Sequence, residues 1–144
     1  MNNSKLILIV DDDSDDQELF TEAVDEVNPE IKCISAVNGQ DALEFLREQD
    51  GKLPDFIFLD LNMPRLNGKQ CLAEIKRSKR FRNIPVIIYT TSKLDEDVKE
   101  TKKLGAAYFL TKPSKFSDLK NAISFLVNEK ADSKKLKLEF LQPL

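Results

Sequence analysis

The chain alternates short, nearly continuous apolar runs with longer stretches in which apolar residues recur every three or four positions. Runs of the first kind are typical of buried parallel strands, and the second spacing is typical of amphipathic helices. The expected strands cover residues 5–10, 31–37, 56–60, 84–90 and 106–111. Because a helix is expected after each strand, the pattern predicts a doubly wound α/β domain whose five-stranded parallel sheet is covered on both sides.

The first expected helix has several candidate start signals. Ser14 to Gln17 fits a capping box, whereas Asp13 is either a helix cap or an extra negative charge beside a metal, of which we favour the cap. Asp15 and Asp16 are interpreted as residues that favour the positive end of the helix dipole. Of the aspartates in this part of the chain, only Asp11 and Asp12 are therefore taken as candidates for a site.

Polar residues stand where the expected strands end. Asp11 and Asp12 follow the first strand, Asp60 ends the third, Thr90 ends the fourth, and Lys112 follows the fifth. In open α/β sheets, ligands bind outside the carboxyl ends of the strands, at the point where the strand order reverses. The sequence therefore predicts three carboxylates, a hydroxyl and an ammonium around one crevice, a set suited to hold Mg²⁺ and a phosphoryl group.

Composition narrows the function classes. At 144 residues and a net charge of −3, the chain has the size of one domain. No apolar run approaches the roughly 20 residues of a membrane span, and the amino terminus lacks a secretory signal, so we expect a cytoplasmic protein without membrane contact. Histidine is absent, which excludes Ser-His-Asp and Cys-His nucleophile pairs and a phosphohistidine on this chain.

Two further features have ordinary explanations. Cys33 and Cys71 lack a Cys-x-x-Cys spacing, so we expect both to be reduced thiols. We expect neither a disulfide nor a zinc site. The basic stretch 76–82 predicts a solvated helix end, because the chain is net acidic and no recognition helix follows. No nucleic-acid partner is expected.

Five sequence motifs carry a family resemblance. Val10-Asp11-Asp12-Asp13, Leu59 to Pro64 with Asn67-Gly68, Tyr89 to Ser92, and Leu110 to Pro113 resemble the receiver domain of two-component response regulators, in the chemotaxis-regulator-like superfamily. The resemblance covers roughly residues 5–128 and implies a flavodoxin-like sheet of strand order 2-1-3-4-5. Residues 1–128 are then the receiver domain, and residues 129–144 a C-terminal tail with no separate output domain.

The resemblance also implies roles for the acidic residues. Asp60 is the expected phosphoacceptor. Asp12, Asp60 and the backbone carbonyl of Asn62 are expected to bind Mg²⁺, which prefers oxygen ligands, with Asp11 acting through a metal-bound water.

Around the phosphoryl group, Lys112 and Thr90 are the expected contacts, and the Lys112–Pro113 peptide bond is expected to be cis. Phosphorylation is expected to draw Thr90 inward while Phe109 fills the space it leaves. Phe109 is otherwise a plain core residue, and Tyr108 is expected on the opposite face of the strand.

The implied function is that of a single-domain response regulator, a signalling protein and not an enzyme, that takes phosphate from a sensor histidine kinase. The longer segment before Ile84-Pro85-Val86 and the run Tyr89 to Ser92 resemble those of single-domain regulators that accompany cyanobacterial and bacterial phytochrome kinases. The downstream protein is undetermined. A phosphorelay intermediate or phosphate sink is the first alternative. A haloacid-dehalogenase-like phosphatase is less consistent, since Asn62 stands where that family has a second aspartate. A flavodoxin-like electron carrier fits poorly because the loop after the first strand is acidic. An unphosphorylated pseudo-receiver fits poorly because the acidic, aspartyl and lysyl positions of the site are all present.

The C-terminal part leaves one alternative open. The helix expected over 94–104 is thinly apolar and is the element expected to shift when Thr90 moves. Four apolar residues of the tail extend beyond a complete receiver core, namely Leu136, Leu138, Phe140 and Leu141. They either fold back over their own domain or form a homodimer contact together with the last helix, and the sequence favours neither.

Overall fold

The computed structural model describes residues 5–128 and 140–144, which form one sheet of order β2-β1-β3-β4-β5-β6 flanked by helices. The strands are β1 (Leu6–Val10), β2 (Lys32–Ala36), β3 (Phe56–Leu59), β4 (Val86–Thr90), β5 (Tyr108–Thr111) and β6 (Leu141–Pro143). The helices are α1 (Ser14–Val27), α2 (Gly39–Glu48), α3 (Gly68–Arg77), α4 (Asp95–Leu104) and α5 (Phe116–Val127). The first five strands are parallel, which confirms the predicted class and order.

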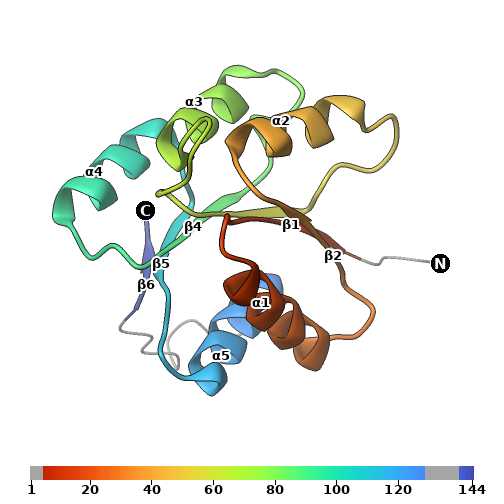
Figure 1. The fold of residues 1–144 in the computed structure, drawn as a ribbon, viewed down its shortest axis with the longest axis vertical. Coiled ribbons are helices and arrows are strands. Elements are labelled where there is room, and N and C mark those ends of the chain that lie inside the picture. Colours follow the sequence, from red (N-terminus) through yellow and green to blue (C-terminus); the bar gives the residue numbers. More distant parts are fainter. Residues whose placement is uncertain (1–4, 129–139) are drawn as a thin grey trace.

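Two layers of helices enclose the sheet. Helices α2, α3 and α4 cover one face, and α1 and α5 cover the other (Figure 1). Alternate strand residues enter the two cores, so Phe109 packs on the first side and Tyr108 on the second, as expected. In the second core the Phe20 ring lies 4.7 Å from that of Phe58 and 5.4 Å from that of Tyr89, measured between centroids. This packing fixes α1 against the middle of the sheet.

The start of α1 differs from the predicted capping box. Asp13, not Ser14, is the N-cap, and its carboxylate accepts two backbone N–H groups of the first turn. Gln17 takes no part in capping, because its side-chain amide donates to the backbone oxygens of Asp11 (2.5 Å) and Ala36 (3.2 Å). The capping-box prediction was therefore wrong and the preference for Asp13 as cap was correct. Gln17 ties α1 to the ends of β1 and β2.

The end of the chain adds a strand that the sequence did not predict. β6 runs antiparallel to β5, with Leu141 opposite Leu110 and buried. The Thr111 N–H donates to the Phe140 oxygen at 2.9 Å. Phe140 and Leu141 thus fold back over their own domain, whereas Leu136 and Leu138 lie outside the described residues. Pairing with β6 covers the edge that β5 would otherwise expose.

Candidate functional site

The three predicted carboxylates meet at the carboxyl edge of the sheet. β1 and β3 are neighbours in a register that pairs Val10 with Leu59, so the residues that follow them lie side by side. The Asp60 N–H donates to the Val10 oxygen at 3.0 Å, which locks this juxtaposition. Carboxylate oxygens of Asp11, Asp12 and Asp60 lie within 4.8 Å of one another. Asp11 and Asp60 are buried and Asp12 is exposed, so the group opens to solvent on one side.

Lys112 reaches this group from the end of β5. Its Nζ lies 2.7 Å from Asp11 Oδ2, 2.8 Å from Asp16 Oδ2 and 3.8 Å from Asp60 Oδ2. Its backbone N–H donates to the Thr90 oxygen at 2.7 Å, which anchors the loop. The ammonium therefore lies inside the acidic group, where the sequence placed it.

The Lys112–Pro113 peptide bond corrects one expectation. No peptide bond among the described residues is cis, so this bond is trans. A tertiary amide before proline still prefers trans by about 0.5–1 kcal/mol. With the trans bond, the lysine side chain already reaches Asp11, so the contact does not require the cis form.

Thr90 ends β4 in a fully buried position, and its hydroxyl oxygen accepts the Ser92 N–H at 3.4 Å. The Ser92 hydroxyl in turn donates to Asp97 Oδ2 on α4 at 2.5 Å. Asp97 also binds Lys69 of α3, with 2.7 Å between Nζ and Oδ1. The loop after Thr90 is thus joined by polar contacts to the helix that was expected to shift.

The other two predicted site residues, Asn62 and Phe109, differ in burial. Asn62 is exposed in the loop after β3, and its backbone N–H is 3.5 Å from Asp60 Oδ1. Phe109 is 1% exposed and belongs to the core beneath α2, α3 and α4. The structure therefore places Asn62 beside Asp60 and Phe109 within the packed interior.

Sequence reasoning missed two contributors to the site. Asp16 was assigned to the helix dipole alone, yet its carboxylate is the second partner of Lys112. Tyr89 was treated as part of a strand, yet its ring centroid lies 5.2 Å from the Lys112 ammonium, a cation–π contact. The signal for Asp16 was its position in the first turn of a helix that begins over the crevice.

Burial and charge perturb the ionisable groups. Burial raises the pKa of Asp60, against the opposing charge of Lys112, and burial likewise raises the pKa of Asp11. For Lys112, burial lowers the pKa, but hydrogen bonds to Asp11 and Asp16 and the charge of Asp60 outweigh it, so the net shift is upward. Three carboxylates, those of Asp11, Asp16 and Asp60, lie within 4 Å of the Lys112 ammonium, and Asp12 adds a fourth to the cluster. A divalent cation with oxygen ligands fits the remaining negative charge.

Asp60→Asn is expected to raise the free energy of unfolding at pH 7 by roughly 1 kcal/mol when divalent ions are chelated. The folded protein raises the pKa of Asp60, which means that it binds this proton more tightly than the unfolded chain does. The resulting stabilisation is fully present when the pH is below the ordinary pKa of 3.8. That contribution is lost as the pH rises through the folded pKa. Urea unfolding at pH 7 and below pH 4 should therefore show the gain only at the higher pH.

Asp13→Asn is the matched control, since it removes the same charge from an exposed position and asparagine also caps helices well. If Asp60→Asn has a lower free energy of unfolding than wild type at pH 7, the result would contradict the cost that we assign to burying this carboxylate.

Comparison with known proteins decides the family. The sequence model of the family described as the response regulator receiver domain matches residues 7–124 of this chain. The chain belongs to this family. A receiver domain is a phosphoacceptor signalling module and not a catalytic enzyme, which excludes the phosphatase and electron-carrier alternatives.

Similar receiver domains include two curated relatives. FilR2, a probable methanogenesis regulatory protein of Methanothrix harundinacea, is 34% identical over 121 residues, which are 82% of this chain and 78% of the relative. The response regulator Rcp1 of Synechocystis sp. is 34% identical over 122 residues, which are 82% and 83% of the two chains.

Solved structures of receiver domains are also similar to this one. The phosphorylated cyanobacterial phytochrome response regulator RcpA gives a TM-score of 0.80 at 28% identity, covering 89% of this chain and 97% of its own. The Mn²⁺-bound form of Rcp1 gives 0.78 at 31% identity with the same coverage. Within the part of the receiver chain that the structure describes, no helix has the length and apolar content to cross a membrane.

Proposed function

We propose that this receiver domain accepts a phosphoryl group from a sensor histidine kinase onto Asp60. The two oxygens of its carboxylate differ, and this difference carries the proposal. Oδ1 accepts the Leu61 N–H at 2.8 Å, whereas Oδ2 faces Lys112 at 3.8 Å. Oδ2 is therefore the oxygen that we assign to the bond with phosphorus, because it faces a cation that stabilises the incoming charge.

The chemistry follows from this placement. Oδ2 of Asp60 attacks the phosphorus of a phosphohistidine, the phosphorus–nitrogen bond breaks, and the histidine of the donor leaves with the electron pair. Lys112 moves from Asp16 toward a phosphoryl oxygen, and the Thr90 hydroxyl donates to another. Positioning and charge neutralisation supply most of the acceleration in such transfers. A carboxylate suffices as nucleophile because the phosphorus–nitrogen bond of the donor is highly activated.

Mg²⁺ is the metal we propose for this site, bound by Asp12, Asp60 and the backbone carbonyl of Asn62, with Asp11 acting through water. The donor set is oxygen only, which favours Mg²⁺ or Mn²⁺ over zinc. Rcp1, a similar protein, has been solved with Mn²⁺. When bound, the ion neutralises the clustered carboxylates and the phosphoryl oxygens.

Signalling is proposed to start at Thr90 and reach Phe109 and α4. The hydroxyl of Thr90 is already linked through Ser92 to Asp97 on α4, so its movement toward a phosphoryl group pulls on that chain of hydrogen bonds. α4 itself buries only Thr101 completely, which makes it easy to displace. A space left by Thr90 would be filled by Phe109 from the adjacent strand β5.

Thr90→Ala is expected to retain phosphorylation while losing the change at α4, because the hydroxyl contacts the phosphoryl group without being attacked. NMR shifts of α4 amides, recorded with and without the phosphoryl mimic beryllofluoride, measure the effect. Thr91→Ala, at an exposed neighbour, is the control and should respond as wild type does. A full α4 response in Thr90→Ala would contradict this switch.

The kinase is proposed to be of the phytochrome type, a proposal that rests on similarity to Rcp1 and RcpA. The receiver protein itself is proposed to be cytoplasmic. Phosphotransfer from a panel of labelled histidine kinases tests both the function and the partner. We expect rapid transfer from a phytochrome-type kinase and slow or no transfer from others. No transfer from any kinase of the panel would oppose the proposed function. Onward transfer of the phosphoryl group to a histidine of a second protein would instead favour a phosphorelay intermediate. If no partner binds in a phosphate-dependent manner, the result would favour a phosphate sink.

Residues 129–144 are proposed to act as a C-terminal extension of the receiver domain. A homodimer through α4, β5 and α5 remains a prediction, since β6 already covers the edge of β5. Sedimentation with and without beryllofluoride tests it, and a monomer in both states would exclude the dimer.

A further inference from the structure

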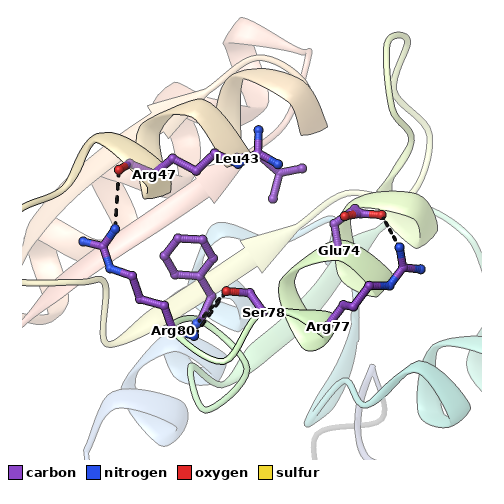
Figure 2. Close-up of a pocket in the computed structure, with 7 residues that line it drawn as sticks. Leu43, Arg47, Glu74, Arg77, Ser78 and Arg80 are labelled. Atoms are coloured by element: carbon purple, nitrogen blue, oxygen red, sulfur yellow. Dashed lines mark hydrogen bonds and ion pairs between the residues drawn. The ribbon is translucent and has the colours of Figure 1, made fainter.

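A shallow groove runs between α2 and α3, away from the phosphoryl site. It consists of two adjoining hollows of about 430 and 550 Å³ that share Leu43, Arg47 and Glu74. One hollow extends toward Phe81, beyond the end of α3, and the other toward Arg65 in the loop after β3. Figure 2 shows Arg47 on α2 across from Glu74 on α3. The groove is thus continuous along the two helices.

Arginine is concentrated in this groove. The chain has five arginines, all between residues 47 and 82, and four of them line the two hollows: Arg47, Arg65, Arg77 and Arg80. Every other basic residue of the chain is a lysine. A guanidinium forms paired hydrogen bonds with a carboxylate, which a lysine ammonium cannot do. The placement therefore indicates recognition of anionic groups rather than general solubility.

Three of the four guanidinium groups have no carboxylate partner among the described residues. Arg77 binds Glu74 at 2.9 Å, and Arg80 donates to the backbone oxygen of Arg47 at 3.4 Å. Among the described residues, no carboxylate forms an ion pair with Arg47, Arg65 or Arg80, and all three side chains are exposed. An incoming anion would replace water at these groups without breaking an existing ion pair.

The floor of the groove is apolar. Leu43 and Phe81 are each 5% exposed and line the first hollow, where the Arg80 guanidinium carbon lies 5.4 Å from the centre of the Phe81 ring. Leu66, half-buried, closes the end next to Arg65. An apolar floor flanked by guanidinium groups fits a ligand that carries an apolar side chain next to carboxylates.

We propose that this groove binds an acidic segment of a partner protein, with an apolar side chain against Leu43 and Phe81 and carboxylates on Arg47, Arg65 and Arg80. A nucleic-acid strand fits less well, because Glu74 lines both hollows and the chain is net acidic, so a long continuous polyanion meets more repulsion than a short acidic segment. The proposal does not require phosphoryl transfer to Asp60.

Binding of a fluorescein-labelled peptide of glutamates around one leucine tests the proposal by fluorescence anisotropy at low and high salt. We expect saturable binding to the full chain that weakens with salt. The double variant Arg47→Gln with Arg80→Gln should bind about tenfold more weakly or worse. Arg82→Gln is the matched control, since this exposed arginine lies outside the groove.

Three outcomes would overturn the proposal. They are equal losses in the control and the double variant, equal binding of a peptide with lysines in place of the glutamates, and tighter binding of duplex DNA than of the acidic peptide. A lack of any peptide binding would also overturn it. Circular dichroism of each variant checks the fold, and because both arginines are exposed, no loss of structure is expected.

Discussion

Gly68→Ala is expected to lower the free energy of unfolding by roughly 3 kcal/mol. A Cβ at this position would lie 2.1 Å from the Asp60 backbone oxygen and 2.6 Å from Leu61 Cα. Both are backbone atoms at the end of β3, which cannot rotate away as a side chain would. The Gly68 N–H also donates to the Leu61 oxygen at 3.0 Å, so α3 begins in direct contact with the strand end. To relieve this clash, the start of α3 and the end of β3 must move apart.

Gly51→Ala is the matched control, because an added Cβ there meets nothing within 4 Å. It should change the free energy of unfolding by less than about 1 kcal/mol. Urea unfolding of both variants measures the difference. We also expect Gly68→Ala to slow phosphorylation, because the displaced backbone carries Asp60. Similar stabilities of the two variants would contradict the close approach of α3 to β3.

Much of the site was predictable because it depends on strand ends. Asp11, Asp60 and Thr90 follow or end apolar runs, and parallel neighbours bring such residues to one edge of the sheet. The register of β1 and β3 then makes Asp11 and Asp60 adjacent without any further information. Topology and alternation thus sufficed for the carboxylates and the hydroxyl.

The remainder depends on side-chain reach and on contacts distant in the chain. The ion pair of Lys112 with Asp16 joins residues 96 positions apart, and helix periodicity carries no information about it. Gln17 looked like a capping partner because spacing alone does not show that two strand-end carbonyls compete for its amide. β6 has three residues and includes Pro143, so no strand pattern could reveal it.

The prediction for the basic stretch 76–82 was correct only in part. It was predicted to be a solvated helix end, and Arg80 and Arg82 are indeed exposed. Phe81 between them is buried, however, and Lys76 donates to the backbone oxygens of Arg82 and Ile84 at 2.9 and 3.0 Å. The segment therefore folds back as a defined turn, and this brings Arg80 beside α2.

Asp60→Asn is expected to abolish phosphorylation of the protein. An amide oxygen is a far weaker nucleophile than a carboxylate oxygen, and the substitution also removes a negative charge from the metal site. Asp12→Asn should slow the reaction through weaker metal binding, yet leave the nucleophile in place. Asp13→Asn, with the same charge change at the exposed cap of α1, should react at the wild-type rate.

The most direct measurement is the phosphoryl content of wild type and Asp60→Asn after incubation with acetyl phosphate and Mg²⁺, determined by intact-protein mass spectrometry. We expect a single acid-stable, base-labile phosphoryl group in wild type, lost when the metal is chelated, and none in the variant. Stoichiometric phosphorylation of Asp60→Asn, or of wild type at another residue, would contradict the assignment of Asp60 as the phosphoacceptor.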